Sequence, residues 1–397
     1  MSNPDRQPDA RLILGGGIAT FMLAMGIGRF VYTPILPDMI GAGLLDVKSA
    51  GLLAATNFIG YFFGALAATP FGRPSTRRIL LMLGIVLSVL TTLAMGLTRE
   101  PLAWHALRFL SGIASAFAQI FVSAFVMEAL ANQGRADRIG WLLGGVGIGI
   151  VTSSLVIEAA QRSGIGWSGQ WMVAGGLAAL FAMPALYNGY RLRPVDEPPR
   201  TDRAGALPRK LFTLAFSLLF LAYGGMGFGY VVQATYLPTL VRSLPQLADF
   251  STLTWLVVGL AAAPSNFIWQ ALVRHLGVTV ALIVAFLLQG VGLLVPVLWH
   301  SVPGAIIGAA ALGATLIGIT ALCLQQARIL APEQFPRALA WMTVVFSLGQ
   351  IGGPPLAALL VGPDNDFLPA TIMTSSVLAV SALLLLPLLP RRSIAAR

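Results

Sequence analysis

The chain alternates long apolar segments with short polar connections over its whole length. A 19-residue window finds twelve segments apolar enough to cross a membrane, at 12–36, 49–71, 79–98, 102–131, 139–160, 168–190, 211–240, 252–273, 278–299, 303–330, 338–361 and 367–390. Each is long enough, because a hydrocarbon core about 30 Å thick takes about 20 helical residues. The pattern therefore predicts an all-α integral membrane protein with twelve transmembrane helices.

Composition excludes the common soluble classes of protein. Charged residues make up 10% of the chain, where a soluble domain has about 25%, and hydrophobic residues make up 57%. Too few polar side chains remain to cover a soluble fold of this size. The single cysteine and three widely spaced histidines form no disulfide or metal-ligand pattern, so we expect no cofactor and no metal. We find no catalytic or phosphate-binding motif and expect no enzyme activity.

The positions of the basic residues, which give the chain a net charge of +10, indicate how it is oriented in the membrane. Nineteen of the 25 basic residues lie in segments on the same side of the membrane as the N-terminus, and four lie in connections on the other side. The remaining two, Arg29 and Arg108, lie within spans. Because cytoplasmic loops are enriched in Lys and Arg, this bias predicts a multi-pass protein of the cell (inner) membrane with both termini in the cytoplasm. No loop is long enough to build a basic face, so we expect no nucleic-acid partner.

The chain divides into two similar halves. Residues 191–210 have linker composition, with six basic residues and four prolines, and separate a six-span bundle at 1–190 from another at 211–397. The sequence MGIGRFVYTPILPDMI at 25–40 matches MGFGYVVQATYLPTLV at 226–241 in six of sixteen positions, at an offset of 201 residues. Repeats of the same orientation build two-bundle transporters, in which solute binds between the bundles.

The repeated segment also predicts a broken helix. Gly26 and Gly28 allow neighbouring helices to approach closely. Pro34 and Pro37 interrupt the hydrogen-bond ladder near the outer end of the first span. The carbonyls freed by such a break must face protein or a cavity. The break is either a hinge or ligand site, or a purely structural kink.

Together these features resemble the major facilitator superfamily. They comprise twelve spans, a 6+6 repeat, a basic glycine-containing loop after the second span, and Arg108 followed by Gly112 in the fourth. The run GIGRFVYTPILP at 26–37 resembles the YbfB/YjiJ-type branch of that superfamily. The resemblance implies the two-bundle fold of a secondary transporter, with the first and fourth spans lining a central cavity.

The loop after the second span departs from the superfamily pattern. It reads GALAATPFGR over 64–73, so that the glycines and the final arginine fit while Thr69 and Pro70 replace the usual Asp and Arg. We expect Glu128 to pair with arginines of this loop at an inner gate. The predicted gate residues are Gly64, Gly72, Arg73, Arg77 and Arg78. A glycine run at 144–149 is similar to that of drug/proton antiporters but lacks its proline.

Two arginines within spans are the leading candidates for substrate binding. Arg29 and Arg108 lie at a similar depth, about 9–10 Å from the outer ends of the first and fourth spans. Charges inside a membrane are costly and usually functional, and a planar guanidinium suits carboxylate or phosphate. The hypothesis is a small organic anion as substrate. The alternative is that Asp38, Glu158 or carbonyls of the broken helix satisfy both arginines permanently.

Other polar side chains at helical spacing extend the candidate site. They are Tyr32, Asn57, Tyr61, Gln119, Tyr230, Gln233, Asn266 and Gln350. Each either contacts substrate or simply joins neighbouring helices. Candidates for ion coupling are Asp38, His105, Glu128 and Glu158. A uniporter or an anion exchanger, which needs no titrating group, stays open.

The sequence thus predicts a secondary active transporter that moves a small organic solute by alternating access, with an anion favoured and proton coupling open. One alternative is a multidrug or metabolite efflux antiporter. Another, of a different class, is a membrane receptor or assembly protein that kept the fold without transporting. We expect the partners to be a small-molecule substrate and the lipid bilayer, and the unit to be a monomer.

Overall fold

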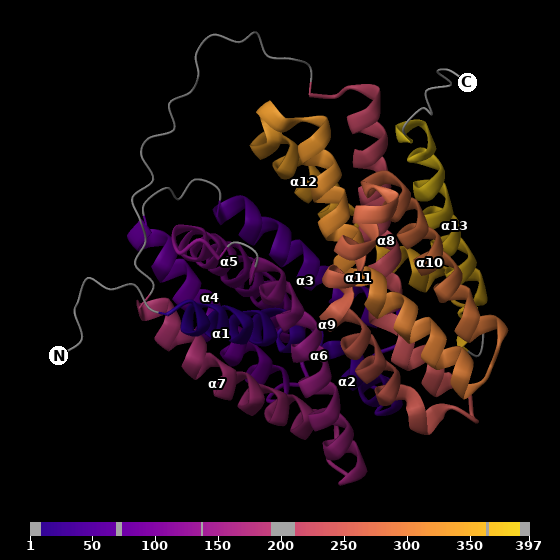
Figure 1. Ribbon diagram of the computed structural model, residues 1–397. Helices are drawn as coiled ribbons and strands as arrows, with labels where there is room; N and C mark the ends of the chain where they lie inside the picture. Colours follow the sequence, from indigo (N-terminus) through magenta and orange to yellow (C-terminus); the bar gives the residue numbers. More distant parts are fainter. Residues whose placement is uncertain (1–8, 69–73, 136–137, 192–210, 363–364, 390–397) are drawn as a thin grey trace.

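The computed structural model describes residues 9–68, 74–135, 138–191, 211–362 and 365–389, and these are helical apart from their connections (Figure 1). The elements are α1 (Ala10–Phe21), the π-helix η1 (Met22–Ile27), α2 (Tyr32–Gly41), α3 (Val47–Ala68), α4 (Pro74–Met95), α5 (Pro101–Asn132), α6 (Ile139–Arg162), α7 (Trp167–Arg191), α8 (Leu214–Ser243), α9 (Ser251–Leu276), α10 (Val278–Leu298), α11 (Val302–Leu330), α12 (Phe335–Leu360) and α13 (Leu368–Leu384), with short 3₁₀ turns at Ala248–Phe250, Pro332–Gln334 and Leu386–Leu388.

The described chain holds twelve helical spans long and apolar enough to cross a membrane. The first, Ala10–Gly41, combines α1, η1 and α2, and each predicted segment overlaps one span over most of its length. The predicted fold class is therefore confirmed.

Several helices start at a side chain that accepts a hydrogen bond from a backbone amide of the first turn, which has no partner within the helix. Asp46 accepts a hydrogen bond from the Ser49 backbone amide at 2.7 Å, just before α3. Thr213 caps α8 and Ser301 caps α11 in the same way, and α5 begins with Pro101, which needs no amide partner. These caps fix where the chain leaves each polar connection and enters the membrane.

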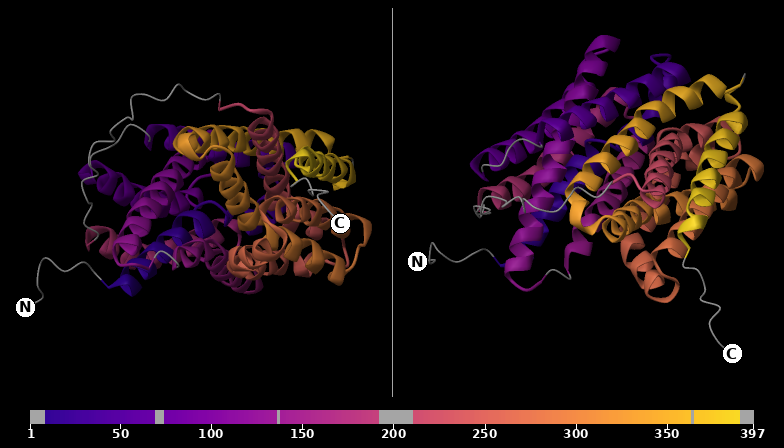
Figure 2. Two further views of the ribbon diagram at one scale, coloured as in Figure 1. Left: turned by 45° about the horizontal axis from the view of Figure 1, so that its top comes forward. Right: turned by 90° about the horizontal axis from the view of Figure 1, so that it is seen from above.

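Both halves repeat one set of helix pairings. In the first half α3 packs on α5, and α4 packs on α5 and α7. In the second half α9 packs on α11, and α10 packs on α11 and α13. Figures 1 and 2 show the indigo-to-magenta helices grouped beside the orange-to-yellow ones. The halves meet along α6 with α9 and α3 with α12. The predicted linker lies outside the described residues except for Arg191.

The first span is broken near its middle. Gly28 N–H bonds to the Leu23 carbonyl and Phe30 N–H to the Met25 carbonyl, which is π-helical spacing, and residues 28–31 form turns before α2 begins. The break therefore begins six residues and ends three residues before Pro34, inside the span, and not near its outer end as predicted. Proline disrupts the turn that precedes it, because its ring clashes with the carbonyl four residues back, and Pro37 sits within α2 without ending it.

Glycine contacts differ between the two predicted positions. A Cβ on Gly26 would lie 2.5 Å from Gly149 Cα, so the first span and α6 touch backbone to backbone as predicted. The atoms nearest to a Cβ on Gly28 would be backbone atoms of its own span, at 3.1 Å and beyond. Gly28 is thus part of the break, and the close approach of a neighbouring helix at this glycine stays a prediction.

Hydrogen bonds fasten the two halves near one face. We call the face where α1 begins and α7 ends the terminal face, and the face between α2 and α3 the opposite face. Asp38 forms an ion pair with Arg242 near the opposite face. Thr252 donates to Gln161 there at 2.6 Å. Tyr236 reaches across to the Val47 carbonyl at 3.1 Å. The hydrogen bonds between the halves therefore gather at the opposite face, while α3 and α12 diverge toward the terminal face in Figure 1. There α6 and α9 stay packed together, with Trp141 against Phe267.

Candidate functional site

Arg29 lies at the break of the first span, in the turn between η1 and α2. Its side chain is 96% buried, with its guanidinium carbon 4.3 Å from the Tyr61 ring centroid and 4.7 Å from that of Phe58. Its Nη1 reaches only the Met25 sulfur, at 4.0 Å, a weak acceptor. Arg29 Nε and Nη2 have no hydrogen-bond partner among the described residues. The site therefore holds a buried cation with two unused donors.

Arg108, on α5, is buried beside the same break but is held by protein. Its Nη1 donates to the Gly28 carbonyl at 3.4 Å, and Ser111 donates to that carbonyl at 3.0 Å. The Arg108 guanidinium also stacks over Tyr32, 4.8 Å from the ring centroid. The carbonyl freed by the break thus faces protein, as predicted, and it satisfies part of Arg108.

The two arginines lie at one level of the molecule, as their sequence depths predict, because Arg108 donates to the carbonyl of Gly28, the residue before Arg29. They are close enough to interact electrostatically as like charges. Neither carboxylate named as an alternative partner reaches them. Asp38 pairs with Arg242, and Glu158 pairs with Arg162 at 2.7 Å on α6. A fixed carboxylate therefore does not neutralise Arg29 in the described structure.

The second half contributes an aromatic and amide cluster. Gln350 on α12 donates through Nε2 to the Tyr230 hydroxyl on α8. Phe346 stacks between two tyrosines, 4.6 Å from Tyr223 and 5.6 Å from Tyr230, with nearly parallel rings. The Gln350 carbonyl oxygen is buried without a partner. Tyr230 is close enough to Arg29 for the two to interact electrostatically, so the cluster lies near Arg29.

Repeat counterparts meet at this place. Arg29 and Tyr230 are separated by 201 residues, the offset of the internal repeat. Thr33 and Ala234 are separated by the same offset, and the Thr33 hydroxyl donates to the Ala234 carbonyl at 2.6 Å. Equivalent atoms of two halves come closest at the symmetry axis that relates them. The site therefore lies on the pseudo-twofold axis between the bundles.

Several other predicted substrate contacts join helices. Tyr32 donates to the Ala50 carbonyl at 2.9 Å, and Asn57 donates to the Arg108 carbonyl at 3.0 Å. Tyr61 donates to Gln119 at 3.1 Å. These bonds tie α2 to α3 and α3 to α5, which positions the arginines. Tyr61 also offers its ring face to Arg29, so it belongs to the site.

Gln233 and Asn266 lie apart from the arginines. Gln233 donates to the Gly308 carbonyl of α11 at 3.3 Å and keeps an unpaired, buried carbonyl oxygen. Asn266 packs against Gly140, the second residue of α6, at the terminal-face end of that helix. Neither has a described contact with Arg29 or Arg108.

The coupling and gate candidates occupy separate places. The His105 ring bonds to Thr56 at 2.7 Å, between α5 and α3. Arg78 donates to the Tyr190 carbonyl at 2.5 Å and covers its ring, which binds α4 to α7. Gly64 packs against α5, where a Cβ would lie 2.9 Å from Ile113 Cα. Gly72 and Arg73 lie outside the described residues, and the proposed pairing of Glu128 with Arg77 or Arg78 stays a prediction.

Asp38 is the most connected of the coupling candidates. Besides its ion pair with Arg242, it accepts hydrogen bonds from Gln161 at 2.8 Å and from Gln170 at 2.6 Å. Gln161 in turn accepts from Thr252 on α9. We call these five residues the latch, since they hold α2, α6, α7, α8 and α9 together at the opposite face.

Sequence reasoning missed several residues of the candidate site and of the latch. Phe58 and Phe346 carry no polar atom, so a search for hydrogen-bonding groups passed over them. Phe346 could have been found from its spacing, four residues before Gln350 on one helix face. Arg242 was counted only as an outer-loop charge. Among the described residues no group of three His, Cys, Asp or Glu could hold a metal ion.

Comparison with known proteins shows the family of this chain. A family model described as "Uncharacterised MFS-type transporter YbfB" matches residues 21–386. The MFS-type transporter YwfA of Bacillus subtilis (strain 168) is 28% identical over 143 residues, which is 36% of this chain and 32% of YwfA. The chain thus spans about a third of the length of that curated relative.

Two solved structures share the fold. A crystal structure of a mutant of the nucleoside transporter NupG has a TM-score of 0.73 and 12% identity, over 96% of this chain and 100% of that chain. Another crystal structure of NupG has a TM-score of 0.67 and 15% identity, over 95% and 98%. At such identities the likeness concerns the fold and carries no information on substrate.

Proposed function

This chain belongs to the YbfB-type family of major facilitator superfamily transporters, and from that premise we propose that it carries a small organic anion by alternating access. The observation that carries the proposal is the unpaired, buried guanidinium of Arg29 on the axis between the bundles. The multi-pass membrane fold and the family are those of transporters, not of enzymes.

Electrostatics favours an anion at Arg29. A charge removed from water costs several kcal/mol unless it is paired, and the rings of Phe58 and Tyr61 return only about 0.5–2 kcal/mol. The free Nε and Nη2 donors lie on one edge of the planar group, which matches the two oxygens of a carboxylate. A bound carboxylate would supply the missing countercharge.

Tyr230 supplies a second contact from the other half. With Gln350 Nε2 as donor, the Tyr230 hydroxyl accepts from Gln350 and keeps its own proton to donate. We propose that this proton points to the anion held by Arg29. One solute would then contact both halves at their axis, and the interface between the repeats is where such transporters bind their solute.

The latch sets the direction in which the site opens. Because the halves are fastened at the opposite face, we propose that this state gives access from the terminal face. The excess of basic residues on that side supports a cytoplasmic terminal face in the cell (inner) membrane. Of the four coupling candidates we propose Asp38, because its ion pair with Arg242 joins the two halves.

The second candidate is a flat uncharged solute, such as a nucleoside. Parallel stacking of Phe346 with Tyr223 and Tyr230 offers an aromatic surface, and the unpaired Gln350 and Gln233 oxygens accept hydrogen bonds. An efflux function for lipophilic cations has less support, since the charge at the axis is positive.

A ligand-stabilisation screen on purified protein tests the proposal. Binding to the folded state raises the apparent midpoint of thermal unfolding by mass action. We expect small mono- or dicarboxylates to raise the midpoint of the wild type, and Arg29→Gln to abolish that rise. The matched control is Arg99→Gln, an exposed arginine at the opposite face, which keeps it.

Nucleosides and lipophilic cations form the other arms of the screen. Stabilisation by nucleosides that survives in Arg29→Gln would replace the anion proposal with the second candidate. Stabilisation by lipophilic cations alone would contradict both and favour efflux.

A further inference from the structure

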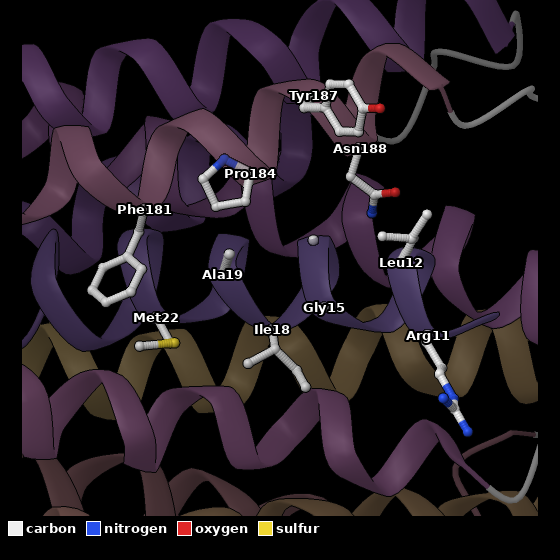
Figure 3. A pocket seen from close by; sticks show the side chains of 11 residues that line it. Arg11, Leu12, Gly15, Ile18, Ala19, Met22, Phe181, Pro184, Tyr187 and Asn188 are labelled. Carbon is white, nitrogen blue, oxygen red and sulfur yellow. The ribbon is translucent and has the colours of Figure 1, made fainter. Parts of the chain in front are cut away.

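A groove outside the central site runs between α1 and α7. Its volume is about 390 Å³, and Figure 3 shows the side chains that line it. The lining runs from Arg11 to Met22 on α1 and from Phe181 to Asn188 on α7. Its lining belongs to the first half alone and shares no residue with the candidate site.

The groove opens toward the bilayer. Leu12, Gly15 and Pro184, which line it, are exposed and lie within membrane-spanning segments. From Arg11 to Met22 the helix advances about 16 Å at 1.5 Å per residue. That is about half of a hydrocarbon core of about 30 Å, which is the depth of one leaflet.

The two ends of the groove differ in polarity. Figure 3 shows Arg11, Tyr187 and Asn188 at one end, toward the terminal face, and Met22 and Phe181 at the other. Arg11 and Tyr187 are exposed, while Asn188 is buried and donates to the Ile13 carbonyl at 2.9 Å. An amphiphile with an anionic head and an apolar tail matches this order.

Small residues keep the groove open. A Cβ on Gly15 would meet nothing within 4 Å. Gly16 is fixed by the opposite constraint, since a Cβ there would lie 2.2 Å from Asn188 Cβ. The helices therefore touch at Gly16, and beside Gly15 the space stays unfilled by protein.

We propose that this groove binds one anionic phospholipid of the terminal-face leaflet, with an acyl chain along α1 and the phosphate at Arg11. Charge complementarity selects the headgroup, because a basic residue at a membrane surface attracts anionic lipid. The length of the groove and its apolar lining select the acyl chain.

The bound lipid would act on the broken span. Its tail ends at Met22, the first residue of η1, and η1 leads directly to the turn that holds Arg29. Filling the groove would restrain α1 against α7 and so stabilise the first half. This inference does not depend on which solute is carried.

Lipid titration of detergent-purified protein tests the site. Phosphatidylglycerol and phosphatidylcholine with identical acyl chains are added separately, and binding is followed by native mass spectrometry and by the unfolding midpoint. We expect wild type to prefer phosphatidylglycerol. Arg11→Gln should lower that preference about fivefold, the factor for one basic residue near an anionic surface. Gly15→Phe should abolish binding by filling the groove.

Matched controls separate this site from general effects. Gly41→Phe adds the same ring at another exposed helical glycine with nothing within 4 Å of its Cβ, and Arg337→Gln removes an exposed arginine from α12. Both should bind lipid as wild type does. Equal binding of the two lipids by wild type, or unchanged phosphatidylglycerol binding in Gly15→Phe, overturns the proposal. So does a change of oligomeric state in Gly15→Phe without loss of lipid, which would identify the groove as a contact between copies.

Discussion

Arg29 and Arg108 show how two buried arginines at one level take different roles. Within the described chain, Arg108 donates to a carbonyl that the broken helix has released, although its Nε lacks a partner, whereas Arg29 donates to no oxygen and both its Nε and its Nη2 lack partners. Sequence spacing could identify both as buried charges at similar depth. It could not say which one would be paired, because that depends on where the Gly28 carbonyl points after the break. Arg29 is therefore the residue that the account assigns to the solute.

Replacing Arg29 with an apolar residue should stabilise the empty protein. An unpaired buried charge costs more than its ring contacts return, so Arg29→Met should raise stability by about 1–2 kcal/mol. The midpoint of thermal unfolding without ligand measures this. Arg108→Met is the matched control and should not raise the midpoint, since it removes a donor to the Gly28 carbonyl. A midpoint lowered by Arg29→Met would make this arginine structural.

The first span is the element in which local sequence and tertiary contacts combine. Its prolines and glycines predicted a break, yet the break lies at 28–31. The prolines explain why the ladder fails, but the position also depends on α5, where Ser111 and Arg108 donate hydrogen bonds to the released Gly28 carbonyl. Contacts between segments that are distant in the sequence cannot be predicted from the local sequence pattern.

Ser111 should therefore stabilise the broken span. Ser111→Ala leaves the Gly28 carbonyl with only the 3.4 Å contact to Arg108, and loss of a buried hydrogen bond costs about 1–3 kcal/mol. The unfolding midpoint should fall accordingly. Ser115→Ala, one turn later on α5, should be nearly neutral, because Ser115 bonds only to the Gly112 carbonyl of its own helix. Equal effects of the two variants would show that the Gly28 carbonyl is satisfied without Ser111.

At the scale of the whole molecule, the internal repeat is the sequence feature that best predicts the architecture. The 201-residue offset predicted two bundles, and the structure brings the same counterparts together at the axis, with Thr33 bonded to Ala234. The latch was beyond prediction, because Asp38 and Arg242 are 204 residues apart and the repeat places Thr239 opposite Asp38. Its position at one face, away from the site, is the arrangement that alternating access requires.

Solute uptake by proteoliposomes tests the central claim most directly. A carboxylate that stabilises the purified protein is offered to vesicles holding wild type, Arg29→Gln or Arg99→Gln, with and without a pH gradient. The account predicts saturable uptake by wild type and Arg99→Gln, and at least a tenfold loss in Arg29→Gln, which corresponds to about 1.4 kcal/mol of binding. Equal uptake by wild type and Arg29→Gln would contradict it, and so would vesicles in which wild type moves no carboxylate above the protein-free background.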